Sequence, residues 1–204
     1  MLPDRIVLAS NNPGKLLEMR ALLSGLNIDI QPQSEFSVPE VAETGLSFVE
    51  NAIIKARNAA THSRIPAIAD DSGIEVECLG GAPGIYSARF AGAGASDEAN
   101  LQLLLAKVEA TGIDRPAARY QCVIVYLNNS EDATPLIAHG TWHGYLVSEP
   151  KGGNGFGYDP IFFVPTHQCT SAELDPGEKN RISHRGQAMQ DLVNKLITLK
   201  RPTY

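Results

Sequence analysis

The chain has 204 residues and a mass of 21.9 kDa, the size of one large domain or of two closely joined lobes. Apolar residues make up 43% and charged residues 20%, as in globular proteins with a buried core, and a net charge of −6 excludes an overall basic surface for nucleic acid. No apolar run approaches the ~18 residues of a membrane span, and three scattered cysteines without a CxxC pair indicate neither a disulfide framework nor a zinc site. We therefore expect one cytoplasmic domain over residues 1–204, with neither nucleic acid nor membrane as a partner.

The first elements read as a strand, a loop and a helix. The apolar run Arg5–Ala9 predicts a buried strand, and apolar residues at helical spacing from Met19 predict a helix. The loop between them suits a phosphate, because a helix N-terminus presents N–H groups and Lys15 adds a cation. It lacks the Walker A spacing, and the alternative interpretation is an ordinary strand-to-helix turn. The candidate residues in this loop are Ser10, Asn11, Asn12, Pro13, Gly14 and Lys15.

A second helix is predicted after Ser47, which forms a capping-box pattern with Glu50 and precedes an alanine-rich stripe. The next apolar run, Ile65–Ala69, predicts a strand that delivers Asp70 and Asp71 to its C-terminal end.

The two adjacent acids are candidates for metal binding and proton transfer. Mg²⁺ takes oxygen ligands and bridges to phosphates, and one carboxylate could accept a proton from an attacking water. Because successive strand side chains point to opposite faces, only one of Asp70 and Asp71 needs to face a cleft. Glu40 and Glu43, in the loop before the second helix, could complete a metal site or be surface charges.

The rest of the chain mixes further helices and strands. Residues 73–79 alternate like a strand, and an acidic helix start follows Ser96. Residues 118–127 and 136–147 predict a hairpin, and a last helix begins near Ser183–Arg185. Parallel strand–helix units early and a hairpin later predict an α/β fold with a mixed sheet.

Two C-terminal segments carry further candidates. The glycine-rich segment 152–160 holds Phe156 and Tyr158, whose rings offer faces for a nucleobase, and Asp159, which could accept hydrogen bonds. Its alternative interpretation is a long loop whose aromatic rings pack on the core.

Donor side chains gather after this loop. Lys179 precedes His184 and Arg185, which lie at a predicted helix start, where cations are unfavourable unless they serve an electron-rich ligand. An ordinary basic helical turn is the alternative interpretation.

Four ordered segments together resemble the inosine triphosphate pyrophosphatase family. They are AIADDSG (Ala67–Gly73), LGGAPGIYSARFAG (Leu79–Gly92), GFGYDPIFF (Gly155–Phe163) and SHRGQA (Ser183–Ala188). With the start at Ile6, the resemblance covers nearly the whole chain. It implies an elongated two-lobed α/β fold around a long mixed sheet, flanked by helices, and a homodimer. It also implies Mg²⁺-dependent cleavage of dITP, ITP and XTP between the α- and β-phosphates, giving a nucleoside monophosphate and pyrophosphate.

The resemblance also implies roles for individual residues. Asp71 matches the general base and a metal contact, with Asp70 beside it. Glu43 matches the acidic metal position, where many relatives have two acids in a row, and Glu40 is a competitor. Lys55 matches a basic residue near the phosphates. The other implied substrate-binding residues are the loop Ser10–Lys15, Ser72, Phe156, Gly157, Tyr158, Asp159, Lys179, His184 and Arg185.

The chemistry agrees with these roles. A triphosphate would be repelled by paired acids unless Mg²⁺ lies between them, and lysines can offset charge on the departing pyrophosphate. Lys179 and Arg185 carry only donors, so they would pair with a 6-keto oxygen but oppose the amino group of adenine, at a cost of about 1–3 kcal/mol per unpaired group. Exclusion of GTP needs a separate penalty on its 2-amino group.

Three other functions compete with this interpretation. One is a pyrophosphatase of related fold that acts on modified pyrimidine nucleotides. Another is a nucleotide sensor without turnover, which the Asp70–Asp71 pair disfavours because a sensor needs no base. The third is a phosphotransferase that uses Lys15, which the missing Walker pattern disfavours.

Overall fold

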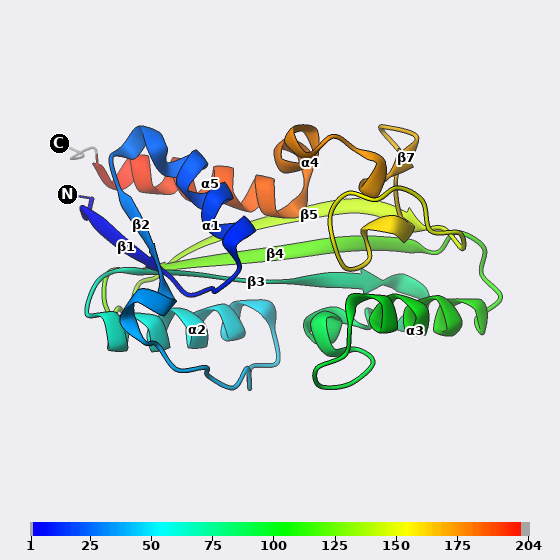
Figure 1. Cartoon of the computed structure of the whole chain (residues 1–204), viewed down its shortest axis with the longest axis horizontal. Coiled ribbons are helices and arrows are strands. Elements are labelled where there is room, and N and C mark those ends of the chain that lie inside the picture. Colours follow the sequence, from blue (N-terminus) through cyan, green and yellow to red (C-terminus); the bar gives the residue numbers. More distant parts are fainter. Residues whose placement is uncertain (1, 201–204) are drawn as a thin grey trace. The chain divides into compact units, whose positions relative to one another are not determined.

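The structure is a computed structural model that describes residues 2–200 (Figure 1). Its helices are α1 (Pro13–Leu23), α2 (Phe48–Ser63), α3 (Asp97–Glu109), α4 (Pro176–Ile182) and α5 (His184–Lys200). Its strands are β1 (Arg5–Leu8), β2 (Asp29–Pro32), β3 (Ala67–Val76), β4 (Ala117–Leu127), β5 (Leu136–Leu146), β6 (Phe162–Val164) and β7 (Cys169–Thr170). In the part of the chain that is described, no helix has the length and apolar character needed to cross a membrane.

The strands form one seven-stranded mixed sheet in the order β2-β1-β3-β4-β5-β6-β7. Strand β1 pairs in parallel with β2 and with β3, whereas β6 pairs antiparallel with both β5 and β7. The predicted α/β fold with a mixed sheet is therefore confirmed. The strands of the expected hairpin, β4 and β5, are neighbours in the sheet.

The chain divides into two compact units, and the first contains residues up to Asp71, Cys122–Gly140 and the chain from Ala188 onward. Its part of the sheet is covered by α1 and α5 on one face and by α2 on the other (Figure 1). Successive side chains of a strand point to opposite faces of the sheet. Ile68 therefore packs in the cluster that contains α1 and α5 residues, and Ala69 packs with the alanines of α2. Small alanine side chains let α2 lie close to the sheet.

The second unit contains Ser72–Gln121 and Thr141–Gln187. Its core joins one face of α3 to the aromatic side chains of the strands, with Leu104, Trp142 and Phe162 among its buried members. Three strands, β3, β4 and β5, contribute residues to both units.

The expected end of the third strand was wrong. β3 does not stop before Asp70 but continues through both acids to Val76. The repulsion that two adjacent carboxylates would cause is relieved because each one meets a lysine, Lys15 for Asp70 and Lys55 for Asp71. Neither lysine lies close to the strand in sequence, so the local pattern contains no sign of the compensation.

Candidate active site

The two acids of β3 point to opposite faces of the sheet. Asp70 follows the alternation of Ile68 and turns toward α1, where Lys15 Nζ donates to its two carboxylate oxygens at 2.9 and 2.8 Å. Asp71 follows Ala69 and turns toward α2, where Lys55 Nζ donates to its Oδ1 at 2.8 Å. Both acids are buried, with 6% and 8% of their surface exposed. Their charges are therefore held in two separate ion pairs.

The phosphate-loop candidates lie where the sequence predicts, between β1 and α1. Asn12 is the N-cap of α1, and its Oδ1 accepts hydrogen bonds from Gly14 N at 2.8 Å and Lys15 N at 3.2 Å. Pro13 occupies the first turn, where its missing N–H is no loss. Ser10 Oγ accepts a hydrogen bond from Asn12 N at 3.1 Å and so closes the turn. The loop therefore presents Lys15 from the first turn of a capped helix.

Glu43 and Asp71 share one cation. Lys55 Nζ donates to Glu43 Oε1 at 2.9 Å as well as to Asp71 Oδ1 at 2.8 Å. The Lys55 side chain is 19% exposed and that of Asp71 10%, so the pair is largely shielded from water. This arrangement favours Glu43 over Glu40 for the acidic metal position.

Asn51 is a residue of this cluster that sequence reasoning missed. Its Nδ2 donates to Asp71 Oδ2 at 3.4 Å, and its Oδ1 accepts from Gly45 N at 2.9 Å. It is fully buried on α2, one turn before Lys55. The amide thus connects Asp71 to the loop that carries Glu43. Its sequence signal is a polar residue beside the alanine stripe, which is easily taken for an exposed position.

The loop before α2 is held tightly against the start of the helix. Ser47 caps α2 by accepting a hydrogen bond from Glu50 N, and Glu50 Oε2 accepts from Leu46 N at 2.9 Å and from the Ser47 hydroxyl at 2.7 Å. A Cβ on Gly45 would lie 2.6 Å from Glu50 Cβ, so this approach requires glycine. The predicted start of α2 at the N-cap Ser47 is confirmed, and the Glu50 side chain reaches back to Leu46 N, one residue before the N-cap.

Burial and charge shift the titration of this cluster. Burial raises the pKa of the Asp71 carboxyl, and the nearby Lys55 only partly offsets that effect. For Lys55, burial acts to lower the pKa, but attraction to Asp71 and Asp70 and hydrogen bonds to Asp71 and Glu43 raise it overall. Asp71 is therefore a stronger base than an exposed aspartate, and Lys55 keeps its proton.

The donor set on the α2 face fits a hard divalent cation. Glu43 and Asp71 offer only oxygen donors, which Mg²⁺ prefers, and they already converge on a single positive group, the Lys55 ammonium. Within residues 2–200, no three His, Cys, Asp or Glu side chains come together as a metal-binding group. Asp70, turned to the other face, is not brought into this pair.

The second cluster lies in the second unit and is centred on Asp159. Its carboxylate accepts hydrogen bonds from Phe156 N at 2.8 Å and from Ser171 Oγ at 2.7 Å, and it forms a buried ion pair with Lys179. Gly155, at φ +82°, passes so close to this carboxylate that a side chain would collide with it. Asp159 is therefore an organiser of the glycine-rich loop, since its oxygens are engaged by the protein.

Phe156 and Tyr158, predicted together, occupy different places. The Phe156 ring is 56% exposed, with Lys179 Nζ at 5.4 Å and the Arg185 guanidinium at 5.7 Å from its centroid. Tyr158 is only 5% exposed, and its hydroxyl donates to the Ser87 carbonyl at 2.7 Å. Phe156 is thus the ring on this loop with a face accessible for stacking.

The start of α5 brings the remaining predicted residues together. α5 begins at His184, as expected, and Arg185 Nη2 donates to Ser72 Oγ at 3.3 Å. The His184 ring stacks on Tyr120, with centroids 4.6 Å apart and planes 7° from parallel. Sequence reasoning missed Tyr120, whose burial, together with the negative charge of Asp159, raises the pKa of its hydroxyl well above the ordinary value.

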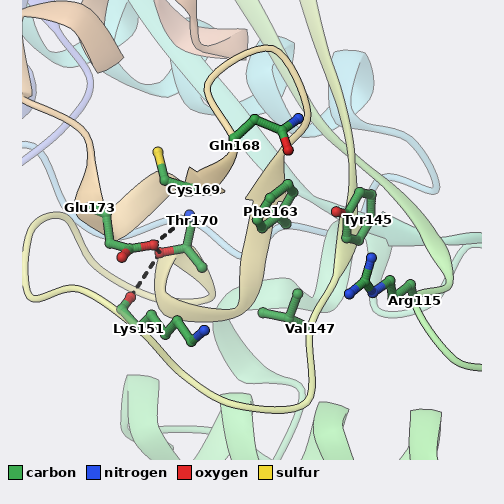
Figure 2. A pocket seen from close by; sticks show the side chains of 9 residues that line it. All are labelled: Arg115, Tyr145, Val147, Lys151, Phe163, Gln168, Cys169, Thr170 and Glu173. Atoms are coloured by element: carbon green, nitrogen blue, oxygen red, sulfur yellow. Dashed lines mark hydrogen bonds between the residues drawn. The ribbon is translucent and has the colours of Figure 1, made fainter.

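A separate pocket of about 300 Å³ lies in the second unit and contains none of the predicted site residues (Figure 2). The rings of Tyr145 and Phe163 stack at 4.7 Å, and Arg115 lies 5.7 Å from the Tyr145 centroid. The Glu173 carboxylate accepts hydrogen bonds from the backbone N–H and the hydroxyl of Thr170. The full lining is Arg115, Tyr145, Val147, Lys151, Phe163, Gln168, Cys169, Thr170 and Glu173.

A family model and several known proteins are similar to this chain over nearly its whole length. The family model described as the Ham1 family matches residues 6–195. A dITP/XTP pyrophosphatase of Thioalkalivibrio sulfidiphilus is 56% identical over 192 residues, which cover 94% of this chain and 98% of the relative. A dITP/XTP pyrophosphatase of Escherichia coli O157:H7 is 54% identical over 193 residues, which cover 95% of this chain and 98% of the relative. A HAM1 protein structure from Coxiella burnetii superposes with a TM-score of 0.92 at 54% identity, covering 97% of this chain and 100% of the other. The Ham1 protein of Staphylococcus aureus gives a TM-score of 0.86 at 41% identity, with the same coverage.

Proposed function

Because the chain belongs to the Ham1 family, we propose that it hydrolyses the non-canonical purine nucleoside triphosphates dITP, ITP and XTP to the monophosphate and pyrophosphate. This reaction removes such nucleotides from the pool before their incorporation into DNA or RNA. The observation that carries the proposal is the Asp71 cluster: a buried carboxylate of raised pKa shares one cation with Glu43. A base beside a cation-binding pair is what hydrolysis of a polyanion requires.

The first cluster would act on the phosphates. Glu43 and Asp71 would hold Mg²⁺, which when bound cancels phosphate charge and polarises the phosphoryl oxygens. Asp71 would accept the proton of the attacking water, because burial has raised its basicity. Lys15 and Lys55 would stabilise the negative charge that develops on the departing pyrophosphate. Asp70 fixes Lys15 by its two hydrogen bonds, and its additional role as a metal ligand stays a prediction.

The second cluster would bind the nucleoside. Phe156 would stack on the base, and Lys179 and Arg185, both within 6 Å of that ring, would donate to the 6-keto oxygen. Asp159 and Tyr120 would act indirectly, by holding Lys179 and His184. An adenine 6-amino group would face donors, which opposes binding by about 1–3 kcal/mol per unpaired group.

Further assignments rest on the resemblance of the sequence. We propose that residues 1–204 form one functional domain, that it works as a homodimer in the cytoplasm, and that Mg²⁺ is the metal. In this proposal Ser10, Asn11, Asn12, Pro13 and Gly14 support the triphosphate, and Ser72, Gly157, Tyr158 and His184 line the nucleoside position.

A substrate panel tests the proposed specificity. With Mg²⁺ present, kcat/KM for dITP and XTP should exceed that for dATP by about 10- to 100-fold, the equivalent of one unpaired donor. The Arg185→Ala variant should lose part of the preference for dITP over dATP. An unchanged preference would refute the donor account, and faster hydrolysis of modified pyrimidine triphosphates would replace the purine assignment. Tight nucleotide binding without hydrolysis would indicate a sensor instead.

A further inference from the structure

Lys55 occupies the position that the proposed metal needs. Its ammonium donates to Glu43 Oε1 at 2.9 Å and to Asp71 Oδ1 at 2.8 Å, the two carboxylates proposed above as metal ligands. The proposed function also requires Lys55 to stabilise the pyrophosphate. Two of the three N–H donors of this ammonium are used by the carboxylates, so at most one is left for the phosphates unless Lys55 gives up a carboxylate.

We infer that Lys55 and the divalent metal are alternative partners of Glu43 and Asp71, and that the triphosphate couples the exchange by giving Lys55 new acceptors. The inference rests on the proposed function and adds a property of the protein before substrate arrives. Lys55 occupies the carboxylates in the nucleotide-free protein, so the metal binds weakly alone and tightly together with the nucleotide.

The charges of the cluster support the exchange. Glu43 and Asp71 carry two negative charges, and one is already balanced by Lys55. A divalent cation that joined all three groups would leave an excess of positive charge in a largely buried place, where repulsion is poorly screened. A triphosphate supplies the missing negative charge. The flexible four-carbon stem of Lys55 allows its ammonium to move without movement of α2.

Asn51 keeps the cluster in place while the partners change. It donates to Asp71 Oδ2, whereas Lys55 is bound to Oδ1, so the two contacts use different oxygens. Its carbonyl oxygen holds Gly45 and with it the loop of Glu43. When Lys55 leaves, the two carboxylates therefore remain side by side.

Lys15 provides a matched contrast. It also neutralises a buried aspartate, but its partner Asp70 faces α1, and Lys15 shares no hydrogen bond with Glu43 or Asp71 in the described residues. Removal of the Lys15 charge changes the electrostatic field at the metal site without removing a direct competitor.

The test is metal affinity in the absence of nucleotide. Mn²⁺ binding is measured by electron paramagnetic resonance and Mg²⁺ binding by calorimetry, at the same pH for all variants. Lys55→Met should bind metal at least about tenfold more tightly than the wild type, and Lys15→Met should stay within about threefold of it. Lys55→Arg, which keeps the charge, should bind metal as weakly as the wild type. Unchanged or weaker metal binding by Lys55→Met would overturn the inference, because a residue that only shaped the site would weaken binding when removed.

The coupling gives a second readout. The non-hydrolysable analogue α,β-methylene dITP should raise metal affinity strongly in the wild type and much less in Lys55→Met. In the wild type, the NMR signal of Lys55 Cε should shift when metal and analogue are added together, which keeps the inference testable if Lys55→Met does not fold. A Lys55 signal that stays constant would count against it. If the wild type binds metal as described but hydrolyses no triphosphate, the proposed function fails and the exchange stands.

Discussion

Asn51→Leu is the substitution that most cleanly separates support of Asp71 from support of the fold. Leucine nearly keeps the volume of the buried asparagine but removes both of its hydrogen bonds, to Asp71 Oδ2 and from Gly45 N. Packing around α2 is thereby preserved. Any loss of stability or of kcat therefore reports on the two polar contacts.

The magnitude follows from these contacts. The partly buried Gly45 N–H, left without its acceptor, costs about 1–3 kcal/mol. The bond to Asp71 is 3.4 Å long, so it adds about 1 kcal/mol, below the usual range for a charged partner. The sum of about 2–4 kcal/mol corresponds to a melting temperature lower by roughly 5–15 °C in a chain of this size. The kcat for dITP should fall by about 10- to 100-fold, the usual effect of removing a support behind a metal ligand.

Thermal unfolding and steady-state kinetics measure the two effects, with Asn58→Leu as the matched control. Asn58 also lies on α2 and donates to the same loop, at Pro39 O, 2.8 Å away, and among the described residues it forms no hydrogen bond with Asp71. The free energy of unfolding of this control should fall by at most about 1.5 kcal/mol, and its kcat should equal that of the wild type. Loss of stability in Asn51→Leu with full kcat would refute the reasoning, because Asn51 would then support the fold alone.

Three further substitutions test other parts of the structure. Asp159→Asn breaks the buried ion pair with Lys179 and should lower the free energy of unfolding, measured by urea denaturation, by about 3–5 kcal/mol. A loss below about 1 kcal/mol would contradict the organising role of Asp159. Hydrogen bonds from Arg181 and His167 lower the pKa of Glu178 from 4.5 to about 2, so its contribution to stability is full above 4.5 and lost as pH falls toward about 2. The stability difference between wild type and Glu178→Gln should shrink over that window, and a difference independent of pH would be inconsistent with the pKa. Gly45→Ala places a Cβ 2.6 Å from Glu50 Cβ and should destabilise by about 1–3 kcal/mol in thermal melts; wild-type stability would show that the loop can move aside.

Elements with local signals were predicted well. The capped start of α2 at Ser47, the strand-to-helix loop before Lys15 and the start of α5 at His184 all appear where the sequence places them. Capping side chains and apolar periodicity act over a few residues, so a single sequence contains them. α4 was missed, because seven residues are too few for a periodic pattern, although the N-cap Asp175 and Pro176 mark its start.

Features that depend on distant contacts were not predictable in this way. The continuation of β3 through Asp70 and Asp71 depends on Lys15 and Lys55, which come from two other elements. The involvement of Asn51 follows from contacts that only the fold creates. Resemblance to a family assigned Glu43 and Asp71 to the metal and Lys55 to the phosphates, whereas periodicity had no means to do so.

The central claim is that Asp71 activates a water for cleavage between the α- and β-phosphates. Its most direct test is hydrolysis of dITP with Mg²⁺ by the wild type and by Asp71→Asn, with pyrophosphate and orthophosphate resolved. The account predicts pyrophosphate and dIMP as the wild-type products and a loss of about 10²- to 10⁴-fold in kcat for Asp71→Asn, a change that keeps the size of the side chain and removes the base. Release of orthophosphate, or wild-type turnover by Asp71→Asn, would contradict it.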